Sequence, residues 1–538
     1  MKKFESFGVM IDMSRNAVMN MESLKRFITI LKKMGYNSVI LYTEDTYEVD
    51  GEPFFGYLRG KYTKEEMKEI DSFARGLGMS VIPCIQTLAH LNAFLRWKKV
   101  GIDCDDILLT DDERTYKLID NMFATLSECF VSRKIHIGMD EAHMLGRGRH
   151  LDRFGYEKAN DIIKRHLNRI LEIAKKYGYE VMLWSDMYFR TWNNGNYAIP
   201  ECKMPQEIID SVPKEVIPVY WDYYKTDEKC YSDMMKNHKQ LSDKTWFAGG
   251  AWGWYGMIPF NKFSITSMVP ALDACRKNGI KNVFMTMWGD DGAECSRFSQ
   301  LPSLLYLAEY AKGNTDEAKI KAKFKRIVGI DYDDFIYIDN PNNVVEYEGR
   351  PRNPSKYMFY SDYFNGYLDY TVKEGAGVKF EEYASELRKT AAKSRRYGYV
   401  FDSAAKLCDV LAVKYELGVR TRAAYKAGDK EALKSLADNE YAKLVKLINV
   451  YARAFEKQWM LDNKPHGFDV QDLRIGGLIR RTESCRRRLL DYVSGKIDRI
   501  DELEEDILAN GPVGESTNIN RAPFISTVNI IHHCAVYI

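Results

Sequence analysis

One unit repeats along the first 300 or so residues: a short apolar run that ends in polar or aromatic residues, then an amphipathic stretch. The apolar runs are FGVMID (7–12), SVILYTED (38–45), SVIPCIQT (80–87), KIHIGMDE (134–141), EVMLWSD (180–186), VIPVYWD (216–222), TWFAGGAW (245–252) and NVFMTMWGD (282–290). Eight such alternations match a (β/α)₈ barrel, whose functional residues follow the carboxyl ends of its strands. A doubly wound open sheet is the alternative, but it would gather these residues at one switch point.

The pattern changes from about residue 316, where long charged segments with helical periodicity replace the strands. The segments are 380–396, 403–427, 430–459 and 474–494. We therefore expect an α/β protein: a (β/α)₈ TIM-type barrel over residues 1–315, followed by a mainly α-helical C-terminal domain over 316–538. Asn340 to Pro354 should form an irregular connection. A chain of 538 residues exceeds the size of most single cores, which agrees with two domains.

Charge and composition narrow the range of partners. Lys and Arg number 78 and Asp and Glu 76, so no overall field favours nucleic acid or an anionic membrane. No run approaches the roughly 18 apolar residues of a membrane span, and the first residues lack an export signal. The ten cysteines have no CxxC spacing, which favours reduced thiols. We expect a cytoplasmic protein without nucleic-acid or membrane partners, whose helical domain is a candidate homodimer surface.

The most informative stretch is KIHIGMDE, in which a strand ends in Asp140 and Glu141. Neighbouring side chains of a regular strand point to opposite faces, so both acids reach one site only where the strand becomes a loop. Two close carboxylates raise each other's proton affinity, so one could act as a general acid near neutral pH. Taken alone the pair is a weak signal, because such pairs also occur as loop acids and helix caps.

The residues around this pair resemble a known family. HIGMDE matches the H-x-G-x-D-E signature of glycoside hydrolase family 20, the β-N-acetylhexosaminidases, and GVMIDMSRN resembles the family's first-strand D-x-S-R segment. The third strand ends in TLAH, where the family commonly has P-G-H, and MWGDD in the eighth strand resembles W-G-E. The resemblance covers roughly residues 5–315. It implies a retaining exo-enzyme that releases terminal N-acetylglucosamine or N-acetylgalactosamine.

The resemblance also implies roles for single residues. Glu141 is the expected acid/base and Asp140 orients the acetamido group, in substrate-assisted catalysis through an oxazolinium intermediate without metal or organic cofactor. The expected substrate-binding residues are Arg15, Glu44, Asp45 and Asp290 for hydroxyls, His90 beside the catalytic pair, Trp184, Trp221, Trp252 and Tyr223 around the N-acetyl group, and Trp288 against the sugar ring. Of the two second-strand acids, Asp45 is the better candidate.

The chain departs from the family pattern in its second strand, where LYTED replaces an H-x-H pattern. Its first expected strand begins within ten residues, so the small α/β domain that precedes many family barrels is expected to be absent or to have been removed, and we expect a divergent subgroup. Asp12 is expected to fix the loop that carries Arg15, and Trp97 and Trp246 are expected in the core.

Three other functions stay open. A metal-dependent hydrolase would use His136, Asp140 and His143. A non-catalytic sugar-binding barrel would keep the tryptophans but lose one catalytic acid. A two-carboxylate retaining glycosidase would use Asp186, Asp222 or Asp290 as nucleophile, and would tolerate sugars without an N-acetyl group.

Overall fold

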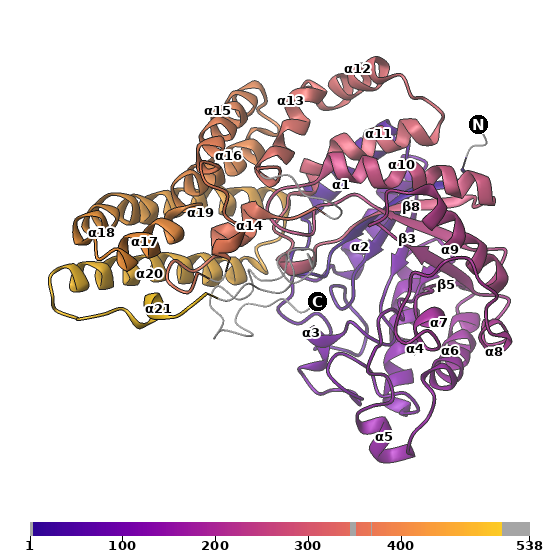
Figure 1. Ribbon diagram of the computed structural model, residues 1–538. Coiled ribbons are helices and arrows are strands. Elements are labelled where there is room, and N and C mark those ends of the chain that lie inside the picture. Colours follow the sequence, from indigo (N-terminus) through magenta and orange to yellow (C-terminus); the bar gives the residue numbers. More distant parts are fainter. Residues whose placement is uncertain (1–3, 345–350, 367, 508–538) are drawn as a thin grey trace.

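The computed structural model describes residues 4–344, 351–366 and 368–507. Eight parallel strands close into a barrel in sequential order, and β8 pairs with β1 from Ser6 opposite Asn282 to Ile11 opposite Met287 (Figure 1). The strands are β1 (Ser6–Asp12), β2 (Ser38–Tyr42), β3 (Ser80–Cys84), β4 (Lys134–His136), β5 (Glu180–Trp184), β6 (Ile217–Trp221), β7 (Trp246–Gly250) and β8 (Asn282–Met287). The predicted (β/α)₈ barrel is confirmed.

Most strands end a few residues before the end of the apolar run that predicted them. β4 has only three residues, because Gly138 (φ 73°), Met139 (φ 73°) and Glu141 (φ 50°) turn the chain through the left-handed region. The polar ends of the runs therefore lie in loops at the mouth of the barrel. This satisfies the condition under which Asp140 and Glu141 can reach one site.

Helices cover the outside of the barrel. The longer ones are α1 (Met21–Met34), α2 (Lys64–Gly76), α4 (Glu113–Cys129), α6 (Ala159–Lys176), α9 (Glu228–Leu241), α10 (Asn261–Asn278) and α11 (Leu301–Ala311). The shorter ones are α3 (Asn92–Leu95), α5 (Arg149–Phe154), α7 (Met187–Arg190), α8 (Gln206–Ile209) and the 3₁₀ turns η1 (Asp290–Gly292) and η2 (Arg297–Gln300). The connection after β5 thus has no long helix, because Pro200, Pro205 and Pro213 interrupt it.

The capping residues agree with the sequence pattern. Thr63 accepts a hydrogen bond from the Glu66 amide (3.1 Å), and Glu66 accepts one from the Thr63 amide (2.9 Å). This reciprocal pair is the predicted capping box, and it fixes the start of α2.

A helical region follows the barrel and lies to one side of it (Figure 1). Its helices are α12 (Glu317–Val328), α13 (Tyr332–Ile336), η3 (Tyr337–Asn342), α14 (Pro354–Tyr360), η4 (Asp369–Thr371), α15 (Gly377–Lys393), α16 (Gly398–Lys414), α17 (Leu417–Lys426), α18 (Lys430–Leu436), the π-turn η5 (Ala437–Tyr441), α19 (Ala442–Asp462), α20 (Phe468–Val493) and α21 (Asp501–Glu504). Much of the predicted irregular connection, residues 345–350, lies outside the described part.

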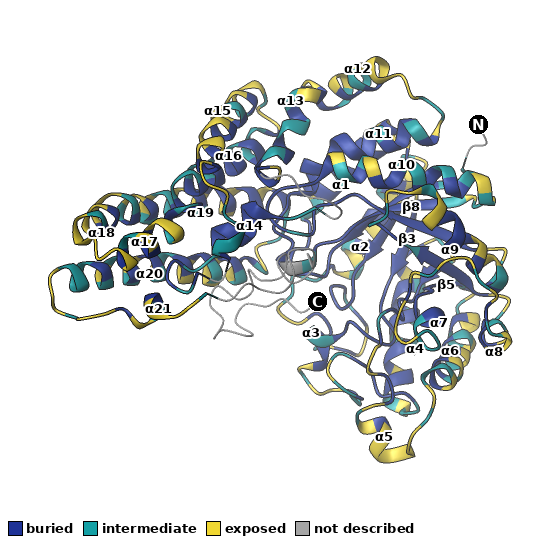
Figure 2. Cartoon of the chain, viewed as in Figure 1, coloured by how far each residue is buried: buried dark blue, intermediate teal, exposed yellow. Residues whose placement is uncertain are grey.

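Two buried apolar clusters form the core. One fills the barrel interior with Met10, Ile40, Met182 and Phe284 and continues into the tryptophans at the carboxyl ends of the strands. The other lies between strands and surrounding helices and runs without a break into the helical region. Figure 2 shows the strands buried and the outer helical faces exposed. Within the described ranges, no helix combines the length and apolar character needed to cross a membrane.

The helical region returns to the barrel at the turn between α19 and α20, here called the 461–467 turn. It contacts the segment that follows β1: the Leu461 carbonyl accepts from Asn20 (3.0 Å) and Ser23 (2.7 Å), and the Lys464 amide donates to the Val18 carbonyl (2.7 Å). Further along, the Asn16 side chain donates to the Gly467 carbonyl (2.7 Å). The loop that carries Arg15 is thus held from outside the barrel.

Candidate active site

Candidate residues at the strand ends share an uncommon backbone. Glu44 (φ 35°), His90 (φ 57°) and Glu141 (φ 50°) all lie in the left-handed region, as does Asn16 (φ 86°). Such conformations cost about 1–3 kcal/mol each for residues other than glycine and concentrate at functional sites. Four of them around one barrel mouth identify this end as the candidate site.

Asp140 is a buried carboxylate with fixed partners. Its Oδ1 accepts a hydrogen bond from Gln86 Nε2 (2.8 Å), and its Oδ2 lies 3.3 Å from His90 Nε2. Burial alone would raise the pKa of Asp140, but the His90 charge and the contacts from His90 and Gln86 lower it to about 2. Burial opposes a charge on His90, yet Asp140 raises the pKa of His90 to about 10. Asp140 is therefore an anion at neutral pH.

Glu141 faces a different environment. About a third of its side chain (34%) is exposed, compared with 9% for Asp140. Its carboxylate lies 3.8 Å from His90 Nε2 and 3.6 Å from Arg190 Nη2, and its amide donates to Asp186 Oδ2 (3.1 Å). One acid of the pair is thus enclosed and charged, and the other is open to a ligand.

Asp186, one of the alternative nucleophiles, is fully buried. It accepts from the Glu141 amide and from Arg190 Nε (3.0 Å), and Trp221 Nε1 lies 3.5 Å away. Burial, then the charges of Asp140 and Glu141, raise its pKa to about 7. These contacts suit a residue that positions Glu141 and Trp221. Another alternative, Asp222, accepts from Tyr220 (3.3 Å) and the Tyr224 amide (3.0 Å).

Asp12 organises the opposite side of the mouth. Its Oδ1 accepts from the amides of Ser14 (2.8 Å) and Arg15 (3.2 Å), and its Oδ2 accepts from the Gly289 amide (2.8 Å). Arg15 Nη1 also donates to Asp12 Oδ2 (3.3 Å). Asp12 therefore fixes the Arg15 loop, as expected, and ties it to the end of β8.

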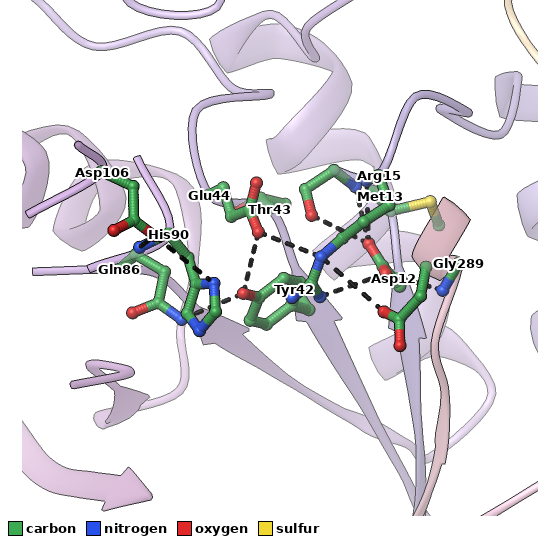
Figure 3. A network of polar contacts seen from close by, with 12 residues as sticks. Asp12, Met13, Arg15, Tyr42, Thr43, Glu44, Gln86, His90, Asp106 and Gly289 are labelled. Atoms are coloured by element: carbon green, nitrogen blue, oxygen red, sulfur yellow. Dashed lines mark hydrogen bonds and ion pairs between the residues drawn. The ribbon is translucent and has the colours of Figure 1, made fainter. Parts of the chain in front are cut away.

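The Arg15 guanidinium lies 4.8 Å from the Tyr42 ring centroid and 4.7 Å from that of Trp288. Its Nε is 3.3 Å from Glu44 Oε1 and 3.9 Å from Asp290 Oδ1. Figure 3 shows the network in which Gln86 donates to Tyr42 (3.0 Å) and Tyr42 donates to Glu44 (3.0 Å). Since Gln86 also contacts Asp140, one polar network links both sides of the mouth.

The two second-strand acids, Glu44 and Asp45, lie in different environments. Asp45 has 2% of its side chain exposed and accepts from Arg59 (3.3 Å), whereas Glu44 lines the open cavity described below. Burial raises the pKa of Glu44 to about 7 against the lowering effect of Arg15. Glu44 therefore lies at the cavity and Asp45 lies in an ion pair with Arg59, and the preference for one of them as a hydroxyl ligand stays a prediction.

Aromatic residues line the region between these two sides. Trp288 Nε1 donates to the Tyr223 hydroxyl (2.9 Å), and Tyr223 stacks on Trp221 with centroids 5.5 Å apart. The ring centroids of Trp184 and Trp288 lie 5.9 Å apart. Trp252 is fully buried and donates to the Tyr223 carbonyl (3.0 Å), so it supports Tyr223 from behind.

Sequence reasoning missed several residues of this site. Gln86 and Tyr42 are polar groups near strand ends, and the rule that identified their neighbours applies to both. Arg190 lies on the short helix α7, where no strand-end pattern marks it.

The first alternative function depended on His136 and His143. His136 accepts from the Gly138 amide (3.1 Å), and burial lowers its pKa to about 3, so the ring is a neutral structural group. In the part of the chain that the structure describes, no three His, Cys, Asp or Glu side chains group in a way that could hold a metal ion.

A cavity of about 690 Å³ opens at this mouth. Arg15, Glu44 and His90 line its inner end. Its outer end reaches Trp97 and the first turn of α20. We expected both Trp97 and Trp246 in the core. Trp246 is buried, but Trp97 is only half-buried and borders the cavity.

Two family models match the chain. "Glycosyl hydrolase family 20, catalytic domain" covers residues 4–240, and "Glycoside Hydrolase 20C C-terminal domain" covers 333–520. Hexosaminidase D of Homo sapiens is 26% identical over 37% of this chain and 41% of its own length, and that of Bos taurus is 24% identical over 37% and 58%. Each match thus spans less than two thirds of the relative. The crystal structure of a family-20 exo-β-N-acetylglucosaminidase from Vibrio harveyi is 16% identical, covers 62% of this chain and 58% of that one, and has a TM-score of 0.47.

Proposed function

Because the chain belongs to glycosyl hydrolase family 20, we propose that it is a retaining exo-β-N-acetylhexosaminidase that releases terminal β-linked N-acetylglucosamine or N-acetylgalactosamine. The observation that carries the proposal is the unequal environment of two adjacent acids. Asp140 is enclosed and anionic, and Glu141 is open to a ligand. The proposed reaction needs a fixed negative charge beside a proton donor, and this pair of acids can supply both.

In the proposed first step the acetamido oxygen of the substrate attacks C1 of the same sugar, an intramolecular reaction with a high effective concentration. The bond from C1 to the leaving oxygen breaks, and Glu141 gives its proton to that oxygen. Asp140 accepts a hydrogen bond from the acetamido N–H and stabilises the positive charge of the oxazolinium ion. The anionic state of Asp140 supports this role.

In the second step Glu141 takes a proton from water, which attacks C1 and reopens the ring. The two displacements together leave the anomeric configuration unchanged. Tyr223, Trp184, Trp221 and Trp288 would enclose the acetamido group. Trp252 would hold Tyr223 in place through its hydrogen bond to the Tyr223 carbonyl.

Arg15, Glu44 and Asp290 would bind the hydroxyls of the terminal sugar. Arg15 is already held by Asp12 and lies against the rings of Tyr42 and Trp288, so its donors are oriented before a ligand arrives. Such preorganisation lowers the entropic cost of binding. We further propose that residues 1–315 are the catalytic unit and 316–538 a helical C-terminal domain. The nine cysteines of the described residues are free thiols, which supports a reducing, cytoplasmic location.

The test compares hydrolysis of a chromogenic N-acetyl-β-glucosaminide with that of the matching β-glucoside. We expect cleavage of the acetamido sugar alone. When the product is followed by NMR, its first anomer should have the same configuration as the substrate. Equal cleavage of both sugars would instead favour a protein nucleophile, and Asp290 would then be the first to test because 32% of its side chain is exposed. Cleavage of neither would favour a sugar-binding protein.

A further inference from the structure

The loop after β8, residues 288–297 and here called the β8 loop, is anchored on two different parts of the chain. On the barrel side, Arg297 donates to the carbonyls of Trp288 (2.7 Å) and Asp12 (2.9 Å). The middle of the loop contacts the helical region instead. Because the loop carries Asp290, whatever fixes it also fixes a carboxylate at the barrel mouth.

Helix α20 holds the middle of the β8 loop at two points. Gln471 Nε2 donates to the Gly292 carbonyl (3.2 Å), and the Gln471 side chain is fully buried. Arg474 follows on the same helix, with its Nη1 2.9 Å from Glu294 Oε1. Gly292 has φ 112°, and a Cβ there would lie 2.8 Å from Arg474 Nη1. The guanidinium is therefore packed directly on the backbone of the turn η1.

Glu294 makes the contact between the β8 loop and the helical region an ionic one. Lys356 of α14 lies 2.7 Å from Glu294 Oε2, and only 1% of either side chain is exposed. Removal of one partner from such a buried cluster is strongly destabilising, so the cluster favours one arrangement. Next to it, Ala293 has φ 53°, a conformation that persists only where the surroundings impose it. The helical region thus holds this part of the loop in a strained shape.

Asp290 lies between two glycines, which leave the backbone of the β8 loop free to adopt many conformations. Gly289 is fixed from the barrel, because its amide donates to Asp12 Oδ2 (2.8 Å). Gly292 is fixed from α20, through its carbonyl and Gln471. The position of Asp290 is therefore set by one contact on each side, one from the barrel and one from the helical region.

We propose that Gln471 and Arg474 are positioning residues that set where Asp290 stands beside Arg15, and so decide how strictly the enzyme distinguishes the two configurations at C4 of the terminal sugar. The inference rests on the proposed function, in which Asp290 and Arg15 bind sugar hydroxyls. Asp290 Oδ1 lies 3.9 Å from Arg15 Nε, and 32% of the Asp290 side chain is exposed, so a ligand can reach this carboxylate. N-acetylglucosamine and N-acetylgalactosamine differ in the direction of one hydroxyl, and a displaced acceptor affects the two unequally.

The experiment measures kcat/KM on a chromogenic N-acetyl-β-glucosaminide and on the matching N-acetyl-β-galactosaminide, and compares the ratio of the two values. Loss of folded enzyme lowers both values equally, so a merely structural role does not change the ratio. The variants are Gln471→Met, Arg474→Lys and Asp290→Asn. Methionine has nearly the size of glutamine but no donor for the loop carbonyl. Arg474→Lys keeps a positive charge beside Glu294 without the planar group, and it replaces Gln471→Met if that variant does not fold.

The matched control is Thr482→Val, about three turns further along α20. Thr482 is fully buried and shares a hydrogen bond with the Tyr363 hydroxyl (2.7 Å) inside the helical region. The control therefore also removes one buried hydrogen bond from the same helix, but away from the β8 loop. It should lower Tm about as much as Gln471→Met does and leave the ratio unchanged.

We expect the ratio in Gln471→Met and Arg474→Lys to change by about three-fold or more, as the loss of one hydrogen bond predicts, and to move toward that of Asp290→Asn. The double variant Gln471→Met with Asp290→Asn should have the ratio of Asp290→Asn alone, because α20 acts through Asp290. A ratio that keeps its wild-type value in the α20 variants, or that changes further in the double variant, would overturn the inference alone. A wild type that cleaves neither sugar would overturn the proposed function and this inference with it.

Discussion

The two sides of the site are supported by different parts of the chain. The catalytic wall (Asp140, Glu141, Tyr223 and Trp288) is held by barrel residues such as Gln86, His90 and Asp186. The hydroxyl wall (Arg15, Asn16 and Glu44) is held by Asp12 from the barrel and by the 461–467 turn from the helical region.

This difference suggests a division of labour. Under the proposed function, the chemistry would depend on the barrel alone, whereas recognition of the sugar hydroxyls would also depend on the helical region. The polar network through Gln86, Tyr42 and Glu44 is the link between them. Mutations on the two walls should therefore separate kcat effects from KM effects.

The largest effect is expected on the catalytic wall. Glu141→Gln removes the proton donor and should lower kcat by roughly 10²–10⁴-fold, the usual contribution of a general acid. Because Glu141 is a third exposed, Tm should change little. Kinetics on the chromogenic N-acetylglucosaminide and a thermal melt provide the check. A kcat within ten-fold of the wild type would remove Glu141 from the mechanism.

Asp140→Asn should reduce kcat to a similar extent, by roughly 10²–10³-fold, because the charge that stabilises the intermediate is lost. Unlike Glu141→Gln, it should also lower Tm, since it leaves His90 buried without its partner. The wild-type pair contributes stability above the usual pKa of Asp140, 3.8, that is lost as pH falls toward about 2. Equal Tm values for the two variants would contradict the ion pair.

On the hydroxyl wall, Arg15→Lys should lower kcat/KM by roughly 10²-fold. A lysine cannot reproduce the planar fork that contacts Asp12 and Glu44 and packs against the rings of Tyr42 and Trp288. The loss should be equal for gluco and galacto substrates if Arg15 binds O3, and unequal if it binds O4. An unchanged kcat/KM would place the sugar hydroxyls elsewhere.

A smaller effect tests the link to the helical region. Gly467 has φ 89°, and a Cβ there would lie 2.3 Å from the Asn16 carbonyl oxygen. Gly329 has φ 88° with nothing within 4 Å, so Gly329→Ala is a control for backbone strain alone. Gly467→Ala should cost about 1–3 kcal/mol more in unfolding free energy than the control and raise KM several-fold at unchanged kcat. A KM equal to that of the control would show that the two regions are independent.

The smallest expected effect is a pH dependence from Glu44. Its pKa of about 7 means that it becomes a carboxylate, and a better acceptor for hydroxyls, as pH rises through neutrality. KM should fall by a few-fold across that range in the wild type and stay flat in Glu44→Gln. A raised acid pKa also means that stability is lost as pH rises from about 4.5 to about 7, so wild-type Tm should fall relative to the variant there. Parallel Tm curves would contradict the raised pKa.

Much of the fold was predictable because each strand of a barrel is buried on both faces and appears as an apolar run. The runs could not show where each strand stops. Residues in the left-handed region, such as Glu44 and Glu141, turn the chain away from the strand direction. Side-chain alternation contains no information about such turns. For this reason the residues alone could not show that Glu44, and not Asp45, lines the cavity.

The grouping of Asp140 and Arg15 at one barrel mouth was predictable because a motif marks each residue, whereas neighbours brought there by tertiary contacts were not predictable. Arg190 comes from a single-turn helix, and Trp97 borders a cavity whose other wall lies on α20. The contact of Asn16 with Gly467 joins residues 451 positions apart. No local pattern of either segment indicates the other.

That contact has a consequence for synthesis on the ribosome. A nascent chain carries every strand of the barrel and both acids once residue 287 has emerged, and domains generally begin to fold from the N-terminal side. The Arg15 loop, however, stays without its outer support until the 461–467 turn has also left the exit tunnel. The loop after the first strand thus waits for one of the last turns, and under the proposed function the substrate-binding loop would be completed later than the catalytic acids.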